Sequence, residues 1–212
     1  MARISYFSIP NYKMHFMSFP TVEIQVPDWI DSLLLDPEKT YTTIAERMDL
    51  VIDLARRNVD AGTGGPFGAA VFDMQTGRLV APGVNGVIPA NCSVVHAEVM
   101  AIMVAQKIMG SYDLGGRGLP PMELVSSTEP CTMCLGAVIW SGVRRLVCGA
   151  RDEDAREIGF DEGPKPHAWP AALEKRGIAV LQDVGRQAAV DVLRTYVKRG
   201  GMVYNARQGA LP

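Results

Sequence analysis

The sequence lacks both a long apolar run and an excess of charge of either sign. No stretch approaches the roughly 20 consecutive apolar residues that a transmembrane helix needs, so we expect no membrane span. The 21 Lys and Arg residues against 23 Asp and Glu residues give a formal net charge of −2. Proteins dedicated to nucleic acids usually carry a basic excess, and the composition therefore disfavours that class.

Signals for export and for disulfides are also scarce. The first 20 residues are interrupted by Pro10, Lys13 and Pro20, and no apolar block leads into a small-residue cleavage site. We therefore expect no signal peptide and a cytoplasmic location. Only four cysteines occur in the chain, at positions 92, 131, 134 and 148. In a chain of this size a Cys-x-x-Cys pair indicates metal or redox chemistry more often than a disulfide framework.

The chain length favours one domain preceded by a short extension. Prolines punctuate residues 1–40, at positions 10, 20, 27 and 37, and this segment has no clear periodicity. We interpret it as an N-terminal extension that packs on the body of the protein. The whole chain is 48% hydrophobic, which is an ordinary globular composition. Residues 41–212 form the predicted domain.

Helical and strand patterns alternate through that domain. Apolar residues at helical spacing predict helices over residues 42–60, 93–109, 131–140, 171–177 and 186–199, with Ser93 as a possible cap of the second. Short apolar runs predict strands over residues 67–73, 78–84, 122–126, 144–149 and 178–181. Alternation of this kind predicts an α/β fold with three layers, helices on both faces of one sheet.

Two motifs carry the chemistry, His96-Ala97-Glu98 and Pro130-Cys131-Thr132-Met133-Cys134. One imidazole and two thiolates make a zinc site with an open fourth position for water, and zinc lowers the pKa of that water towards neutrality. A Cys-x-x-Cys at a helix start turns both sulfurs to one side, where the helix terminus favours thiolates. Glu98 is placed to transfer a proton without binding the metal.

Each half of this pattern is weak alone. A structural zinc site would need a fourth ligand, which Cys92 or Cys148 could in principle supply. The joint pattern of His-x-Glu followed by Pro-Cys-x-x-Cys is the signature of zinc deaminases that act on nucleobases. We therefore predict a catalytic zinc on His96, Cys131 and Cys134, and we interpret Cys92 and Cys148 as buried small hydrophobes.

The sequence resembles the cytidine deaminase-like superfamily over about residues 43–204, and within it the short bacterial type of guanine deaminase. The resemblance is carried by Asn58-Val59-Asp60-Ala61-Gly62, Gly64-Gly65-Pro66-Phe67-Gly68-Ala69, Asn85, His96-Ala97-Glu98-Val99, residues 129–137 and residues 154–162. It implies a three-layer fold with a central mixed sheet. It also implies zinc-dependent hydrolysis of guanine to xanthine and ammonia in purine catabolism. Such a pocket would read the amide–guanidine edge of the base, and because amino-oxo triazines such as ammeline present the same edge, we predict side activity on them.

The resemblance also implies roles for single residues. Glu98 would shuttle protons, Asn85 would hydrogen-bond the purine, and Ala97 would contact it. Phe67 and Trp140 would form aromatic walls, and Tyr204 would close the pocket. Glu162 stands where the family usually has Asp, and we predict that it holds the 2-amino group and assists the second proton transfer.

Structural explanations exist for several of these residues. Phe67 and Trp140 could pack in the core, Glu162 could be a solvated loop charge, and Asn85-Gly86 is a natural turn pair.

Several functional alternatives remain open at this point. Residues 147–152 also resemble the adenosine deaminases of transfer RNA, and other bases such as cytosine or a pterin are possible substrates. An inactive, zinc-stabilised binding module is a different class, against which the intact Glu98 argues. Family members are usually homodimers, and residues 186–204 are the segment that would be exchanged between subunits. No membrane partner and no nucleic-acid partner is expected.

Overall fold

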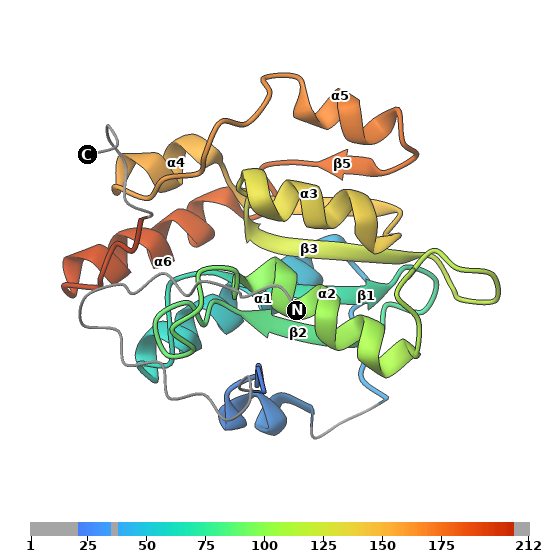
Figure 1. Ribbon diagram of the computed structural model, residues 1–212, viewed down its shortest axis with the longest axis horizontal. Coiled ribbons are helices and arrows are strands. Elements are labelled where there is room, and N and C mark those ends of the chain that lie inside the picture. Colours follow the sequence, from blue (N-terminus) through green and yellow to red (C-terminus); the bar gives the residue numbers. More distant parts are fainter. Residues whose placement is uncertain (1–20, 35–37, 206–212) are drawn as a thin grey trace, which may run out of the picture.

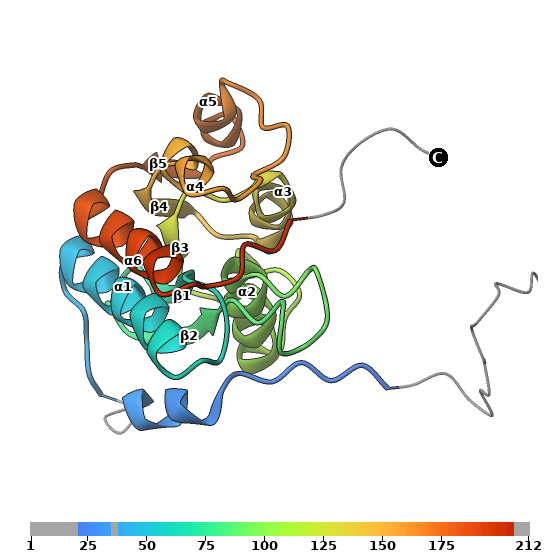
Figure 2. The same cartoon turned by 90° about the vertical axis from the view of Figure 1, so that its left-hand side faces the viewer.

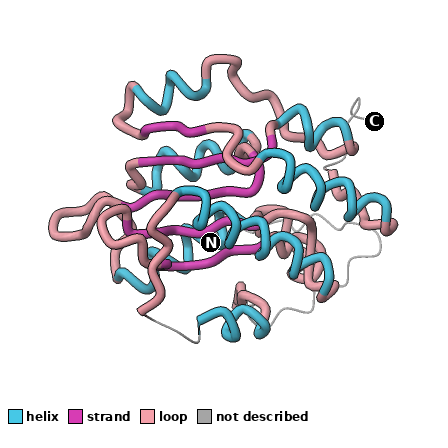
Figure 3. The backbone as a smooth tube through the Cα atoms, turned by 180° about the vertical axis from the view of Figure 1, so that it is seen from behind, coloured by secondary structure: helices cyan, strands magenta, loops and turns pink. Residues whose placement is uncertain are grey.

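The computed structural model describes residues 21–34 and 38–205. Its centre is a five-stranded mixed sheet in the order β2-β1-β3-β4-β5 (Figures 1 and 3). The strands are β1 (Gly68–Asp73), β2 (Leu79–Val84), β3 (Met122–Thr128), β4 (Arg145–Ala150) and β5 (Ala179–Leu181). β1 runs antiparallel to both of its neighbours, whereas β3, β4 and β5 are parallel. This confirms the mixed sheet that the resemblance implies.

Helices cover both faces of the sheet, so the predicted three-layer α/β/α architecture is confirmed. One apolar core joins the sheet to α2 (Ala97–Met109), α3 (Thr132–Ser141) and α5 (Trp169–Glu174). A second core joins the other face to α1 (Ile44–Asp60) and α6 (Arg186–Lys198). Figure 2 shows these two groups of helices on opposite sides of the strands.

The ends of the helices follow local chemistry. Thr43 caps α1, and its side chain and that of Glu46 each accept the backbone N–H of the other residue, which satisfies two otherwise unpaired donors. The predicted cap at Ser93 is wrong, because α2 begins only at Ala97 and has His96 at its N-cap position. Since the segment before it forms turns instead of helix, Ser93 faces the cavity described below.

Two short elements were not predicted. The helix α4 (Asp152–Glu157) follows β4, and its Asp154 accepts hydrogen bonds from Arg186. Asp154 is buried, although it belongs to a run of charged residues at 151–154. The 3₁₀ helix η1 (Asp28–Leu34) lies within the predicted extension, where Pro27 at its start obscures any periodicity.

Part of the extension packs on the domain. Ile30 is fully buried in the core formed with α1 and the sheet, and the indole N–H of Trp29 donates to the hydroxyl of Thr63. The structure therefore joins residues 28–30 to the body, as the sequence-based expectation of a packed extension requires. The expectations for residues 1–20 lie outside the described residues. None of the helices in residues 21–34 and 38–205 has the length and apolarity that crossing a membrane requires.

Candidate metal centre and active site

The three predicted ligands meet where α2 and α3 begin. His96 is the N-cap residue of α2, and Cys131 is the N-cap residue of α3. The Sγ of Cys131 lies 3.5 Å from the backbone nitrogen of Cys134, which donates to it. Because β3 leads directly into this turn, the sheet fixes both sulfurs against the start of α2. Within the described chain these three side chains form the one cluster found whose donor atoms lie within 4.8 Å of one another.

The spacing of the donor atoms fits zinc. The Nδ1 atom of His96 lies 3.6 Å from Sγ of Cys131 and 3.5 Å from Sγ of Cys134. A tetrahedral zinc ion with ordinary Zn–N and Zn–S bonds would separate a nitrogen and a sulfur ligand by about 3.6 Å. The side chains are thus already arranged as such an ion needs. Neither Cys92 nor Cys148 belongs to the cluster, so no cysteine in the described chain supplies a fourth ligand.

Charge in the cluster is distributed unequally between the two sulfurs. Hydrogen bonding from Cys134 lowers the pKa of Cys131 to about 4, despite the opposing effect of burial. The pKa of Cys134 is raised well above its ordinary value, first because it donates that bond and also because it is buried. Burial lowers the pKa of His96, but its hydrogen bond with Cys131 and the nearby Glu98 carboxylate raise it overall. One sulfur of the pair is therefore ready to bind a cation as a thiolate.

Glu98 lies beside the cluster without completing it. Its carboxylate accepts a hydrogen bond of 3.4 Å from the Cys134 thiol, and only 6% of the residue is exposed. Burial raises the pKa of Glu98, and the neighbouring Cys131 raises it further. A buried acid with a raised pKa next to a metal site is suited to accept and return protons.

A cavity of about 550 Å³ opens beside these groups. Most of the predicted site residues line it together: Phe67, Asn85, His96, Glu98, Cys131, Glu162 and Tyr204. They come from the ends of strands, the starts of helices, the loop that follows α4 and the C-terminal segment. The volume and the mixture of aromatic and polar walls are typical of a site for a small molecule.

Aromatic rings form one side of the cavity. The ring of Phe160 packs edge-on against Phe67 at 5.0 Å and against Tyr204 at 5.2 Å between centroids. Phe160 lies in one of the stretches that carry the family resemblance, but sequence reasoning assigned it no role. The signal was its place in the Gly-Phe-Asp stretch before Glu162. These rings present the flat apolar surfaces on which a heterocyclic base stacks.

Asn85 and Glu162 contribute polar groups to the same cavity. The backbone N–H of Asn85 donates to the carbonyl of Phe67, and its Oδ1 accepts from the backbone of Val87. Glu162 is 7% exposed, and burial followed by the nearby Cys131 raises its pKa to about 8. Its carboxylate makes no hydrogen bond within the described residues. A protonated Glu162 is therefore available to a ligand at neutral pH.

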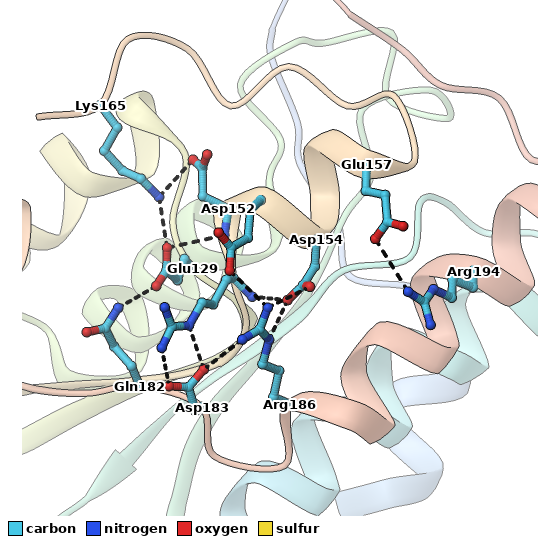
Figure 4. Close-up of polar contacts among 11 residues, drawn as sticks. Glu129, Asp152, Asp154, Glu157, Lys165, Gln182, Asp183, Arg186 and Arg194 are labelled. Carbon is cyan, nitrogen blue, oxygen red and sulfur yellow. Dashed lines mark hydrogen bonds and ion pairs between the residues drawn. The ribbon is translucent and has the colours of Figure 1, made fainter. Parts of the chain in front are cut away.

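A third acid, Glu129, lines the cavity but is held by the protein (Figure 4). Its carboxylate accepts hydrogen bonds from the side chain of Gln182, the backbone of Asp152 and the ammonium of Lys165. Lys165 also donates to the carbonyl of Pro130 at 3.1 Å. Sequence reasoning missed Lys165, whose loop between prolines gives no pattern. This network holds the turn that carries the two cysteines and engages the Glu129 carboxylate, whereas Glu98 and Glu162 are not part of it.

Two hydroxyl groups in the cavity wall lack partners. The Oγ1 of Thr128 and the Oη of Tyr204 are buried and make no hydrogen bond with the described residues. A buried hydroxyl without a partner costs about 1–3 kcal/mol. Both unpartnered hydroxyls belong to residues that line the same cavity.

Two predicted contact residues do not line the cavity of the described chain. Trp140 lies on α3 and is 82% exposed, so it forms no wall there. The alternative expectation, that Trp140 packs in the core, is likewise wrong. Ala97 is fully buried in the core beneath the start of α2. Of the two cysteines interpreted as buried, Cys148 is buried and Cys92 is partly exposed.

Comparison with known proteins identifies the class to which this fold and site belong. The profile of the cytidine and deoxycytidylate deaminase zinc-binding region matches residues 42–150, more than half of the chain. The chain belongs to this family of zinc-dependent hydrolases.

Individual proteins also match this chain, over half of its length or more. The chain is 41% identical to the guanine deaminase of Bacillus subtilis (strain 168) over 111 residues, which are 52% of this chain and 67% of that protein. The solved structure of guanine deaminase from Nitrosomonas europaea is 46% identical, with a TM-score of 0.79 over 83% of this chain and 96% of that one. The structure of NE0047 in complex with 2,6-diaminopurine gives a TM-score of 0.82 at 46% identity, covering 87% and 97%. A variant of NE0047 has been solved with 8-azaguanine.

Proposed function

We propose that this chain hydrolyses guanine to xanthine and ammonia. The observation that carries the proposal is the His96, Cys131 and Cys134 cluster at zinc spacing, with the buried Glu98 beside it in a cavity large enough to hold a purine base. Relatives at 41–46% identity are guanine deaminases, and one related protein binds the guanine analogue 8-azaguanine. The net reaction adds one water molecule and releases one ammonia.

His96, Cys131 and Cys134 would hold the zinc ion. When bound, zinc supplies a Lewis acid that activates a water molecule for attack on the ring carbon bearing the amino group. Cys131 and Cys134 offer it thiolates at a helix start, where the dipole favours negative charge. The raised pKa of Cys134 describes the metal-free thiol, which must lose its proton on binding.

Glu98 moves the first proton in this scheme. It accepts a proton from the attacking water and returns it to the ring nitrogen adjacent to the attacked carbon. Burial keeps its pKa raised, which makes the carboxylate a stronger base towards the proton of the attacking water. Exclusion of bulk water around Glu98 keeps the proton within the site.

Glu162 moves the second proton. Ammonia leaves only after the amino nitrogen has gained a proton, since an amide anion is a far poorer leaving group. With a pKa of about 8, Glu162 carries that proton at neutral pH and lines the cavity. Once ammonia has left, Glu162 regains a proton from the hydroxyl group that the water added to the ring carbon, so both acids end the cycle in their starting states. Asn85 and the rings of Phe67 and Tyr204 would orient the base between the two acids.

Measurement of ammonia release tests this function. Zinc-loaded protein is offered guanine, adenine, cytosine, a pterin, ammeline and transfer RNA. We expect turnover of guanine, slower turnover of ammeline, which presents a similar amino-oxo edge, and none of adenosine in transfer RNA. If ammonia were released from transfer RNA alone, the chain would be an adenosine deaminase of transfer RNA and not a guanine deaminase. If ammonia were released from no substrate, the result would support an inactive binding module.

Variants of the two acids test the assignment of the protons. Glu98→Gln is expected to lower kcat by about 10²–10⁴ while zinc content stays at one ion per chain. Glu162→Gln is expected to lower kcat as well, with a smaller effect on binding of 8-azaguanine. Normal turnover by Glu162→Gln alongside an inactive Glu98→Gln would remove Glu162 from the mechanism.

We further propose a homodimer in the cytoplasm. Support comes from α3, where Trp140 is 82% exposed and Met133 is 36% exposed one heptad earlier on the same helix. Since Met133 also lines the cavity, a second copy seated on this face would cover the cavity rim. Light scattering of wild type and Trp140→Arg tests the dimer, which the variant is expected to weaken.

Exchange of the C-terminal segment is part of the same proposal. The structure returns residues 201–205 to their own chain, where Asn205 accepts a hydrogen bond from the backbone of Asp161 and donates one to the carbonyl of Gly159. An exchanged dimer would make these contacts between subunits. Mixing two variants, each inactive in a different part of the site, would restore activity only with exchange.

A further inference from the structure

Asn58 is a fully buried polar residue on the inner face of α1, near its C-terminal end. Asparagine is a poor helix former, and a buried amide is costly unless its hydrogen bonds are satisfied. Neighbouring positions on the same face, such as Leu54 and Ala55, are apolar core residues. Helix formation and core packing therefore do not explain why this position carries an amide.

The hydrogen bonds of Asn58 explain it. The Nδ2 atom donates to the carbonyl of Gly65 at 2.9 Å and to the carbonyl of Asn85 at 2.8 Å. The Oδ1 atom accepts from the hydroxyl of Thr63 at 2.8 Å. Both donors and the acceptor of the amide are thus used, and both carbonyls belong to segments that form the cavity wall.

The contact with Asn85 fixes the backbone of a residue that we propose reads the base. At its N–H, Asn85 is bound to the carbonyl of Phe67 at 3.0 Å, and at its carbonyl it is bound to Asn58. Its peptide groups are therefore held on both sides. Asn85 lines the cavity from this fixed backbone, and its Oδ1 accepts from the backbone of Val87, so the position of the side chain depends on the backbone bonds together with this one.

The contact with Gly65 fixes the glycine turn that adjoins Asn85. The carbonyl of Gly65 also accepts from the backbone of Phe67, and a Cβ at Gly65 would lie 2.3 Å from the hydroxyl oxygen of Tyr204. At Gly64 a Cβ would lie 1.8 Å from the carbonyl oxygen of Asn85. Only glycine allows the turn to approach Asn85 so closely, and Asn58 lies where the two segments meet.

The orientation of the Asn58 amide is itself controlled from the N-terminal segment. The hydroxyl of Thr63 donates to Oδ1 of Asn58 and accepts from the indole N–H of Trp29 at 3.0 Å. Trp29 is followed by the fully buried Ile30. With its acceptor bound to Thr63, the amide cannot rotate to turn Oδ1 towards the two carbonyl oxygens without losing three hydrogen bonds.

We propose that Asn58 is a positioning residue for base recognition and that Thr63 and Trp29 hold its amide in the required orientation. The inference rests on the proposed function, because Asn85 is assigned to the base there. The N-terminal segment thereby gains a role in the site, since a hydrogen-bonded series from Trp29 through Thr63 and Asn58 reaches the cavity wall. Asn58 acts only through the backbone of Asn85 and Gly65 and is itself absent from the cavity lining.

Substitutions at Thr63 test the proposal with little change in shape. Thr63→Val removes the hydroxyl and keeps the side-chain volume, whereas Thr63→Ser keeps the hydroxyl. We expect Thr63→Val to raise KM for guanine about three- to tenfold, the effect of one lost hydrogen bond, with kcat within about twofold of wild type. Thr63→Ser should restore the wild-type KM. Thr76→Val, in the turn between β1 and β2, removes a hydroxyl bonded to Asp73 and is the matched control.

Two further variants extend the series. Trp29→Phe keeps an aromatic ring but removes the N–H, and we expect a smaller rise in KM than for Thr63→Val. Asn58→Asp replaces the donor by an oxygen that faces two carbonyls, and we expect the largest rise; if it does not fold, Thr63→Val decides. All assays are run well below the unfolding midpoint, so that lost stability alone leaves KM unchanged.

The results of these assays distinguish a failure of the positioning role of Asn58 from a failure of the proposed function. If wild type deaminates guanine and Thr63→Val has an unchanged KM, the positioning role is wrong and Asn58 is purely structural. If Thr63→Ser fails to restore KM, the hydroxyl is not the group that matters. If wild type itself is inactive on guanine, the proposed function fails; binding of 8-azaguanine, measured by calorimetry, then decides the inference in place of KM.

Discussion

The buried polar side chains of Glu162 and Thr128 in the cavity wall lower the stability of the folded chain. Glu162 has a pKa of about 8 in the folded chain against 4.5 as its ordinary value, chiefly because it is buried. Between those values the folded state keeps a proton that the unfolded chain has lost. The contribution of Glu162 to the free energy of unfolding is therefore full below about pH 4.5 and declines as pH rises to about 8.

Glu162→Gln should consequently stabilise the protein most at high pH. The amide of glutamine does not ionise, so the variant lacks the decrease in the free energy of unfolding that wild type shows as pH rises. We expect its unfolding midpoint to exceed that of wild type by more at pH 8 than at pH 5, measured by calorimetry on chelator-treated protein. An equal difference at both pH values would mean that the carboxyl is not desolvated in the folded state.

Thr128 also carries a buried polar group that lowers stability, but its hydroxyl does not ionise. Its hydroxyl is buried in the cavity wall and has no partner in the described chain. Thr128→Val has nearly the same shape, so we expect an unfolding midpoint equal to wild type or higher, and a raised KM for guanine. Thr128→Ser, which keeps the hydroxyl, is the control for KM. A clear loss of stability in Thr128→Val would show that the hydroxyl has a structural partner.

The sequence predicted these site residues unequally. The ligands His96, Cys131 and Cys134 were predictable because their chemistry is specific and their spacing within each motif is short. Phe160 and Lys165 were not, because their roles depend on rings and carboxylates from distant segments. Trp140 was misplaced for a related reason. The sequence does not reveal whether an aromatic side chain near the end of a helix points into the protein or into the solvent.

At the scale of elements, close packing of β2 against the first turn of α2 positions the acid of the site. A Cβ at Gly83 would lie 2.3 Å from the carbonyl oxygen of Ala97 and 2.5 Å from the backbone nitrogen of Ala101. These are backbone atoms that cannot rotate away. Only a glycine at this point of β2 lets the helix start, with His96 and Glu98, approach the sheet.

Gly83→Ala should therefore displace the start of α2. We expect reduced stability, by about 1–3 kcal/mol as for other overpacked cores, and a lower zinc content per chain, measured by atomic absorption. Gly86→Ala is a milder control, because its Cβ would meet the side chain of Val95 at 3.1 Å. Full zinc content and activity in Gly83→Ala would show that the site does not depend on this contact.

The elements themselves were largely predictable. All five predicted strands and the five predicted helices appear, because their apolar periodicities reflect burial on one or both faces. The strand order was outside what periodicity reveals, since β1 pairs with β3 across more than 40 intervening residues. The short α4 was missed because its six residues are mostly charged and show no apolar periodicity; its Asp154 pairs with Arg186, 32 positions away.

At the scale of the whole molecule, the proposed zinc ion would join elements that are remote in sequence. His96 begins α2, whereas Cys131 and Cys134 lie at the start of α3, at least 35 residues later. Both helices pack in the same core against the sheet. An ion held by all three side chains binds only the folded chain with full affinity, so its binding free energy adds to the stability of the whole domain.

Removal of zinc should therefore lower the unfolding midpoint. At a free zinc concentration about a thousand times the dissociation constant, binding contributes about 4 kcal/mol, which corresponds to roughly 8–16 °C for a chain of this size. We expect chelation to lower the midpoint by that order and added zinc to restore it, as followed by circular dichroism. His96→Ala and Cys134→Ser are the controls, since each should unfold at the same temperature with and without zinc. If wild type loses its zinc with an unchanged midpoint, the ion is held by a site that forms equally well in the unfolded chain, and the preformed cluster at the start of α2 and α3 is not what binds it.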